Sequence, residues 1–245
     1  MIYTLDKRSK SWSGEAVGIL VLDCAYPYIP GNVANANTYP FPVRYHEVKG
    51  ADTQRMVYQA DKSLVSAFVE GAKQLEREGV RAITGACGFM ALFQKEVADA
   101  VDVPVFLSSL LQIPFIVQTL SSRQKLGVIT ANKSKLTTSH FRSVGVTEDM
   151  PVVVYGMENK PEFLEAILHC RGTLDNELMQ KEIIEVVDEM IEREGTIGAI
   201  LLECSDLPPY AKLLHDHTGL PIYDFITMIK HVYNAVTPKQ YEGHL

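Results

Sequence analysis

The chain has 245 residues, of which 47% are hydrophobic and 22% charged, which is typical of a globular protein and not of a disordered one. The net charge of −7 argues against a general binder of nucleic acid or of anionic membranes. Apolar stretches fall short of the roughly 18 uninterrupted residues of a membrane span. The N-terminus, MIYTLDKRSKSW, has no apolar core of signal-peptide length, so we expect a cytoplasmic protein with free thiols.

Strand and helix signals alternate along the first half of the chain. A continuous apolar run at 16–22 predicts a strand covered on both faces, and alternation at 43–48 predicts an edge strand. The segment between them, 24–42, is rich in Pro, Asn and Gly, which is typical of a functional loop or a lid. The next predicted elements are a helix at 61–78, a strand at 81–86, a helix at 89–101, a strand at 103–107 and a helix at 110–120.

The second half continues the alternation. Its predicted strands are 125–131, 151–157, 197–203 and 220–224, and its predicted helices are 133–143, 161–170, 175–193, 208–217 and 225–236. Strands separated by helices indicate parallel sheets with right-handed crossovers. We therefore expect an α/β fold.

An internal repeat relates the two halves. Placing Cys87 on Cys204, an offset of 117 positions (204 − 87), aligns identical residues along the flanking segments. The identical pairs include Ala82 and Ala199, Ile83 and Ile200, Lys95 and Lys212, and Pro104 and Pro221. In the preceding strands Gly18-Ile19 matches Gly127-Val128 at an offset of 109 positions (127 − 18). The chain is thus predicted to consist of two related α/β halves.

The matched cysteines are the strongest candidates for chemistry. Each ends a predicted buried strand and opens a predicted helix, and ligands of parallel sheets bind at the carboxyl ends of strands. A helix N-terminus favours the thiolate form, so we expect a lowered pKa for Cys87 and Cys204. Two thiols facing each other across a cleft could act as acid and base on opposite faces of one carbon. A single cysteine is more often a small buried hydrophobe, and we interpret Cys24 and Cys170 in that way.

The segments TGA-Cys87-GFM and LLE-Cys204-SDLPP, with Leu22-Asp23 at the end of the first strand, resemble the aspartate/glutamate racemase superfamily. This superfamily includes hydantoin racemases, maleate isomerases and arylmalonate decarboxylases. The resemblance implies two pseudo-symmetric Rossmann- or flavodoxin-like parallel-sheet domains with the active site between them. It also implies catalysis without pyridoxal phosphate or another cofactor. The implied domains are 1–109 plus 222–245, which carries Cys87, and 110–221, which carries Cys204.

The residues after the cysteines depart from the family pattern. Glutamate racemases have Asn-Thr after the first cysteine and Thr-His after the second, where this chain has Gly88-Phe89 and Ser205-Asp206. The candidate substrate-binding residues are Asp23, Asn32, Gly88, Phe89, Thr130, Asn132, Ser205 and Asp206. Helix capping is the alternative role for Asn132, and turn formation is the alternative for Asn32. Strand alternation would turn Glu203 to the other face, where we expect an ion pair more than a general base.

The leading hypothesis is a cofactor-independent racemase or epimerase of an amino acid or a related carboxylate, with Cys87 and Cys204 as the two bases. A hydantoin racemase, a maleate isomerase-like enzyme and an arylmalonate decarboxylase-like enzyme are alternatives on the same scaffold, and a catalytically silent binding protein is a further alternative. The expected partner is a small molecule with a carboxylate or amide, without nucleic acid or membrane; a homodimer is left open. The sequence offers no metal motif, because no C-x-x-C pair is present and His215 and His217 do not share a helix face.

Overall fold

Two parallel sheets of four strands each form the framework of the computed structural model, which describes residue 2 and residues 11–244. The first sheet has the order β2-β1-β3-β4, with β1 at Val17–Leu22, β2 at Val43–Val48, β3 at Ala82–Gly85 and β4 at Val105–Phe106. The second has the order β6-β5-β7-β8, with β5 at Lys125–Thr130, β6 at Val152–Gly156, β7 at Ile197–Leu202 and β8 at Ile222–Tyr223. The predicted α/β class is confirmed. The predicted lack of a targeting segment at 1–12 falls mostly outside the described residues.

The repeat is visible in the register of the two sheets. Ile83 pairs with Val105 in the first sheet, and Ile200 pairs with Ile222 at the equivalent place in the second. Gly18 likewise pairs with Ile83, and Gly127 pairs with Ile200. The offset of 117 therefore relates β3 and β4 to β7 and β8, and an offset of 109 (127 − 18) relates β1 to β5, so Cys87 and Cys204 follow equivalent strands.

The longer helices cover the sheets through apolar stripes. In α1, Val65–Arg77, the residues Phe68, Ala72 and Leu75 share a face and are buried. The other α-helices are α2 (Gln94–Ala98), α3 (Ile113–Thr119), α4 (Thr138–Ser143), α5 (Pro161–Phe163), α6 (Asn176–Glu194), α7 (Ala211–Thr218) and α8 (Phe225–Val236). Among the described helices, none is long and apolar enough to cross a membrane.

Several helices begin with tighter or wider turns than the sequence pattern predicts. The predicted helix 89–101 is a 3₁₀ segment, η4 (Gly88–Phe93), followed by the short α2, and the residues of η4 are buried almost all round. The other 3₁₀ segments are η1 (Ala36–Thr38), η3 (Lys62–Leu64), η5 (Ser109–Gln112) and η7 (Pro208–Tyr210), and the π-helical segments are η2 (Gln54–Tyr58) and η6 (Leu164–Leu168). Packing on all sides replaces the one-sided stripe from which a regular helix is recognised.

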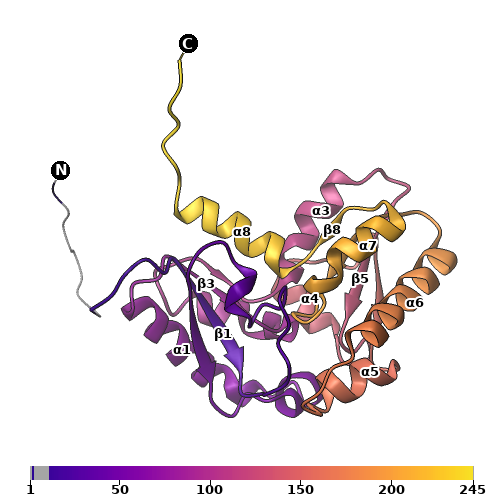
Figure 1. Ribbon diagram of the computed structural model, residues 1–245, viewed down its shortest axis with the longest axis horizontal. Coiled ribbons are helices and arrows are strands. Elements are labelled where there is room, and N and C mark those ends of the chain that lie inside the picture. Colours follow the sequence, from indigo (N-terminus) through magenta and orange to yellow (C-terminus); the bar gives the residue numbers. More distant parts are fainter. Residues whose placement is uncertain (1, 3–10, 245) are drawn as a thin grey trace.

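The two halves share a continuous core and exchange helices (Figure 1). Figure 1 places α1 and β1 in one half and β5, α5 and α6 in the other. α3 contacts β5, whereas α8 contacts β3 of the first sheet. The division into 1–109 plus 222–245 and 110–221 stays a prediction, and β8 lies in the second sheet although 222 was assigned to the first domain.

Candidate active site

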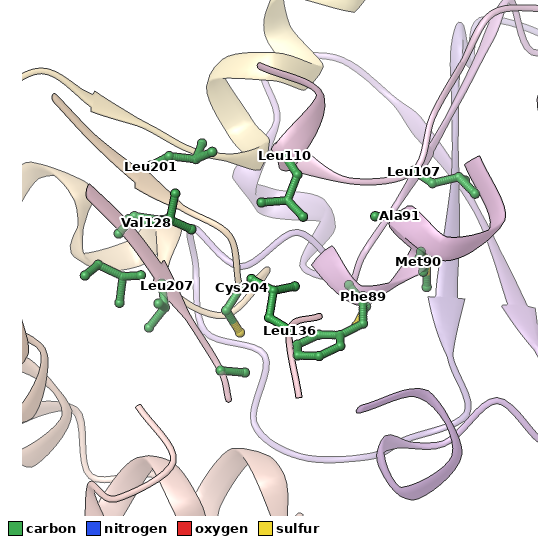
Figure 2. Packing of buried hydrophobic residues seen from close by; sticks show 14 of the residues in the cluster. Phe89, Met90, Ala91, Leu107, Leu110, Val128, Leu136, Leu201, Cys204 and Leu207 are labelled. Atoms are coloured by element: carbon green, nitrogen blue, oxygen red, sulfur yellow. The ribbon is translucent and has the colours of Figure 1, made fainter. Parts of the chain in front are cut away.

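Both matched cysteines line one small cavity between the halves. Cys87 follows β3 and Cys204 follows β7 closely, and their residues are only 8% and 6% exposed. The cavity has a volume of about 30 Å³, which is space for about two water molecules. Figure 2 shows Cys204 among apolar residues of both halves, including Phe89 of η4 and Val128 of β5. The structure thus brings the two predicted catalytic residues to the same place.

Hydrogen bonds between the halves hold the two strand ends in position. The Ser205 hydroxyl donates to the carbonyl of Ala86 at 2.8 Å, and the backbone N–H of Val33 donates to the carbonyl of Ser205 at 3.3 Å. Each cysteine carbonyl also closes a turn, by accepting from the N–H of Met90 after Cys87 and from the N–H three positions after Cys204. The backbone around both thiols is therefore fixed by contacts from the opposite half.

The electrostatic environment of the thiols differs from the one predicted at a helix start. Burial raises the pKa of Cys87, and the nearby Glu203 carboxyl raises it further. Burial and the Asp206 carboxyl raise the pKa of Cys204 well above its ordinary value. The backbone N–H of Phe89 lowers the pKa of Cys87, and that of Asp206 lowers the pKa of Cys204, as predicted. Both effects are smaller than the increase caused by burial. The predicted lowering of the pKa is wrong because burial next to carboxyl groups exceeds the effect of two N–H dipoles.

Asp206 is the polar centre of the cavity on the Cys204 side. Its carboxylate accepts hydrogen bonds from Asn32 Nδ2 at 2.6 Å and from the Tyr26 hydroxyl at 3.2 Å. The Cys204 Sγ donates to the same carboxylate at 3.4 Å. Burial raises the pKa of Asp206, while these three hydrogen bonds lower it. Asp206 is therefore placed to receive the proton of the Cys204 thiol.

Glu203 does not lie on the other face of its strand in an ion pair, as was predicted. Its residue is fully buried and lines the cavity, and no Lys, Arg or His is among the described residues that line the cavity with it. Oε2 accepts from the Thr130 hydroxyl at 2.8 Å, whereas Oε1 has no hydrogen-bond partner among the described residues. Burial raises the pKa of Glu203 to about 7, against smaller opposing effects of Thr130 and the Ala131 N–H. The face prediction failed because β7 ends at Leu202, so strand alternation does not extend to Glu203.

Four of the eight predicted substrate-binding residues lie away from the cavity lining. The Asp23 carboxylate accepts from the N–H of Gly50, and the Thr130 hydroxyl is used by Glu203. Asn132 accepts from the Ser134 hydroxyl and the backbone N–H that follows it, as expected of a turn or capping residue. Asn32 acts on the cavity only through Asp206. The four that line the cavity are Gly88, Phe89, Ser205 and Asp206.

The long loop 24–42 supplies a cavity residue that the sequence reasoning missed. Tyr26 lines the cavity and packs against Tyr28 with ring centroids 4.5 Å apart. Farther along the loop, Gly31 has φ +100°, and a Cβ there would lie 2.8 Å from Cα of Pro209 in the second half. The composition of the loop predicted a functional role but not which residue has it. The packing of the loop against Pro209 of the second half is what brings Tyr26 to the cavity. Thr53, just before η2, is a second missed lining residue.

The cavity lining is acidic and aromatic. Its ionisable side chains are Tyr26, Cys87, Glu203, Cys204 and Asp206, and the residues described as lining it include no Lys, Arg or His. Such a site suits a ligand with a cationic group, which carboxylates and a tyrosine ring attract. A ligand carboxylate there has to be held by neutral donors, because the described lining offers no cation to pair with it.

Comparisons with known proteins agree with this architecture. A family model described as Asp/Glu/hydantoin racemase matches residues 40–229. The chain is 31% identical over 218 residues to a dimethylsulfoniopropionate lyase of Durusdinium sp. clade D, a match that covers 86% of this chain and 71% of that protein. It is 29% identical over 221 residues to dimethylsulfoniopropionate lyase 3 of Emiliania huxleyi, covering 86% of this chain and 57% of that protein. Across the curated relatives, the chain spans between 45% and 71% of their length.

Solved structures share the fold. The allantoin racemase from Klebsiella pneumoniae superposes with a TM-score of 0.63 at 14% sequence identity, covering 92% of this chain and 95% of that chain. At that identity the likeness concerns the two-sheet fold alone. The resemblance to the racemase superfamily that the cysteine segments indicated is confirmed by the family match and by this fold.

Proposed function

The chain belongs to the Asp/Glu/hydantoin racemase family, and from this premise we propose that it is an enzyme that removes a proton from the carbon next to a substrate carboxylate. In this proposal Cys204 is the base. Its thiol already donates to Asp206 at 3.4 Å, so transfer of that proton generates the thiolate without a change of partner. Cys87 lies on the other wall of the same cavity.

The reaction that the cavity supports best is a β-elimination from a propanoate with a sulfonium group at the β carbon, such as dimethylsulfoniopropionate. Asp206 takes the proton of Cys204, and the thiolate then takes the α proton of the substrate. The C–H electron pair forms the new C=C bond, and the C–S electron pair leaves with sulfur. The products are dimethyl sulfide and acrylate. Asp206 finally releases its proton to solvent, so the reaction yields one proton overall.

One observation carries this choice: a carboxylate and a tyrosine ring line the cavity, and no Lys, Arg or His is among the described lining residues. A sulfonium group beside Asp206 and Tyr26 is attracted by both. Its positive charge also stabilises negative charge on Cys204, whose pKa is otherwise held high by burial. The substrate would thus help to create the base that attacks it. The similarity to lyases of that substrate supports the same choice.

Racemisation or epimerisation is the second candidate, and the pairing of the thiols favours it. Cys87 and Cys204 come from opposite halves and line one cavity, as a two-base exchange at one carbon requires. Both reactions begin with removal of an α proton. They differ in the second step, because elimination needs no acid for a neutral sulfide leaving group, whereas racemisation needs a proton donor on the opposite face.

Product analysis separates the two candidates. Purified protein is incubated with dimethylsulfoniopropionate, and dimethyl sulfide is measured by gas chromatography of the headspace; in parallel, an amino-acid and hydantoin panel in D₂O is followed for exchange at Cα by NMR. We expect dimethyl sulfide from the wild type, none from Cys204→Ser, and residual release from Cys87→Ser. Exchange in the panel without dimethyl sulfide, together with loss of racemisation in both variants, would establish the second candidate instead.

A further inference from the structure

Glu203 is a buried carboxyl group of the cavity to which the reaction above assigns no role. Its side chain occupies the space beside Gly88, because a Cβ built on that glycine would lie 1.9 Å from Glu203 Oε1. Both residues line the cavity, and Gly88 directly follows Cys87. The absence of a side chain at Gly88 therefore makes room for a carboxyl group that comes from the opposite half. The free Oε1 therefore faces the backbone of Gly88, in the turn that follows Cys87.

The two oxygens of Glu203 are not equivalent. The Thr130 hydroxyl, which has no other hydrogen bond among the described residues, donates to Oε2 at 2.8 Å. Oε1 is fully buried without a partner among those residues. A buried acceptor-only oxygen without a donor is costly, whereas a protonated oxygen can serve as a donor once a ligand arrives. The hydrogen bond from Thr130 thus leaves Oε1 as the oxygen that carries the proton of a neutral acid.

We propose that Glu203 is held as a neutral carboxylic acid whose Oε1–H donates a hydrogen bond to the carboxylate of the substrate. The inference rests on the proposed function in one respect, namely that the ligand carries a carboxylate. A donor of this kind suits a cavity whose described lining has no basic residue. Removal of the α proton concentrates further negative charge on the carboxylate oxygens, so the same hydrogen bond strengthens as the reaction proceeds.

The ionisable groups around Glu203 do not obscure the loss of its proton near pH 7. The Cys87 and Cys204 thiols have raised pKa values and are neutral near pH 7. Asp206 has a raised pKa through burial, and it bonds Asn32, Tyr26 and Cys204 and not Glu203. His140, behind Phe89, has its pKa lowered to about 4 by burial and is neutral as well. Glu203 itself, with a pKa of about 7, loses its donor proton as the pH rises through neutrality.

The test uses propionate as a probe, because it carries the carboxylate without the sulfonium group. Its affinity is measured by isothermal titration calorimetry at pH 6 and pH 8, for the wild type, Glu203→Gln and Glu203→Ala. With a pKa of about 7, the protonated fraction of Glu203 falls from about nine-tenths to about one-tenth, so wild-type affinity falls about tenfold. Glu203→Gln keeps an N–H donor, so it should bind within threefold of wild type at pH 6 and keep that affinity at pH 8. Glu203→Ala should bind at least tenfold more weakly at pH 6.

Two controls make the result specific. Glu96→Gln, on the exposed side of α2, should retain the wild-type pH dependence. Thr130→Val removes a hydrogen bond that lowers the pKa of Glu203, so the pH midpoint of propionate binding should move upward. Equal wild-type affinity at both pH values, tighter binding at pH 8, or loss of binding in Glu203→Gln would overturn the proposal.

A separate readout distinguishes this inference from the proposed function. Infrared difference spectra of wild type minus Glu203→Gln, recorded at pH 6 without ligand, should contain the C=O band of a protonated carboxyl group. In the wild type that band should fall to about one-tenth of its intensity at pH 8. Its presence together with a failure to release dimethyl sulfide would leave the acid intact and refute only the elimination. Its absence at pH 6 would refute the neutral acid, whatever the substrate.

Discussion

Replacing Gly88 by alanine tests the contact on which the arrangement of Glu203 depends. The added Cβ would lie 1.9 Å from Oε1, 2.2 Å from Cδ and 2.6 Å from the backbone carbonyl of Glu203. The carboxyl group cannot swing away cheaply, because its other oxygen accepts from Thr130 at 2.8 Å. Overpacking of a core costs about 1–3 kcal/mol, and loss of the Thr130 hydrogen bond adds about 1 kcal/mol. We therefore expect Gly88→Ala to lower the free energy of unfolding by about 2–4 kcal/mol.

A double-mutant cycle in urea unfolding identifies the source of that loss. In a Glu203→Ala background the clashes with Oε1 and Cδ are absent, so Gly88→Ala should cost at least about 1 kcal/mol less than in the wild type. Gly85→Ala is the matched control. Its Cβ would lie 2.3 Å from the backbone carbonyl of Leu107, so its cost should not depend on Glu203. Additivity of Gly88→Ala and Glu203→Ala within about 0.5 kcal/mol would refute the reasoning.

Three further substitutions test the charges and hydrogen bonds of the cavity. Glu203 is protonated in the folded protein below its pKa of about 7 but ionises near 4.5 in the unfolded chain. As the pH rises from 4.5 to 7, the free energy of unfolding of the wild type should therefore fall by about 3 kcal/mol relative to that of Glu203→Gln. Parallel pH profiles of the two proteins in urea unfolding would contradict this. Asn32→Ala removes a 2.6 Å hydrogen bond to buried Asp206, which should cost about 1–3 kcal/mol in the same assay and raise the pKa of Asp206; an unchanged stability would show that the bond contributes little. Tyr26→Phe keeps the ring and should leave KM for dimethylsulfoniopropionate within about threefold, whereas Tyr26→Leu should raise KM because the cation–π attraction is lost; equal KM values would exclude that attraction.

The sheets could be predicted from local patterns. Continuous apolar runs such as 16–22 form buried central strands, and the repeat aligned on the matched cysteines predicted two related α/β halves, which the structure shows as two four-stranded sheets. The cavity lining depended on contacts that no local pattern encodes. Glu203 reaches the cavity because β7 ends one residue earlier, and Tyr26 reaches it because a loop of the first half packs against Pro209 of the second.

The pKa of the thiols shows a similar limit. The sequence indicates where a strand ends and a helical turn begins, and hence unpaired backbone N–H groups near each sulfur. It does not show how deeply the sulfur is buried or that Glu203 and Asp206 lie beside the thiols. Those long-range effects reverse the direction predicted from the local one. A short helical segment such as η4 also offers a weaker dipole than the long regular helix that the pattern indicated.

The symmetry of the backbone and the asymmetry of the side chains together bear on the choice between elimination and racemisation. Positions related by the offset of 117 have unlike chemistry around the two thiols: Ala86, Gly88 and Phe89 surround Cys87, whereas Glu203, Ser205 and Asp206 surround Cys204. A racemase has to exchange protons on both faces of the substrate carbon, which requires a proton acceptor near each thiol. Only Cys204, among the described residues, has a carboxylate to which its thiol donates, at 3.4 Å. The equivalent position beside Cys87 is the apolar Phe89, which has no group to accept a proton. One thiol that donates to a carboxylate is sufficient for elimination. Among the described residues no carboxylate accepts a hydrogen bond from Cys87, and the Glu203 carboxyl near it raises its pKa, so this asymmetry favours elimination over exchange between mirror-image faces.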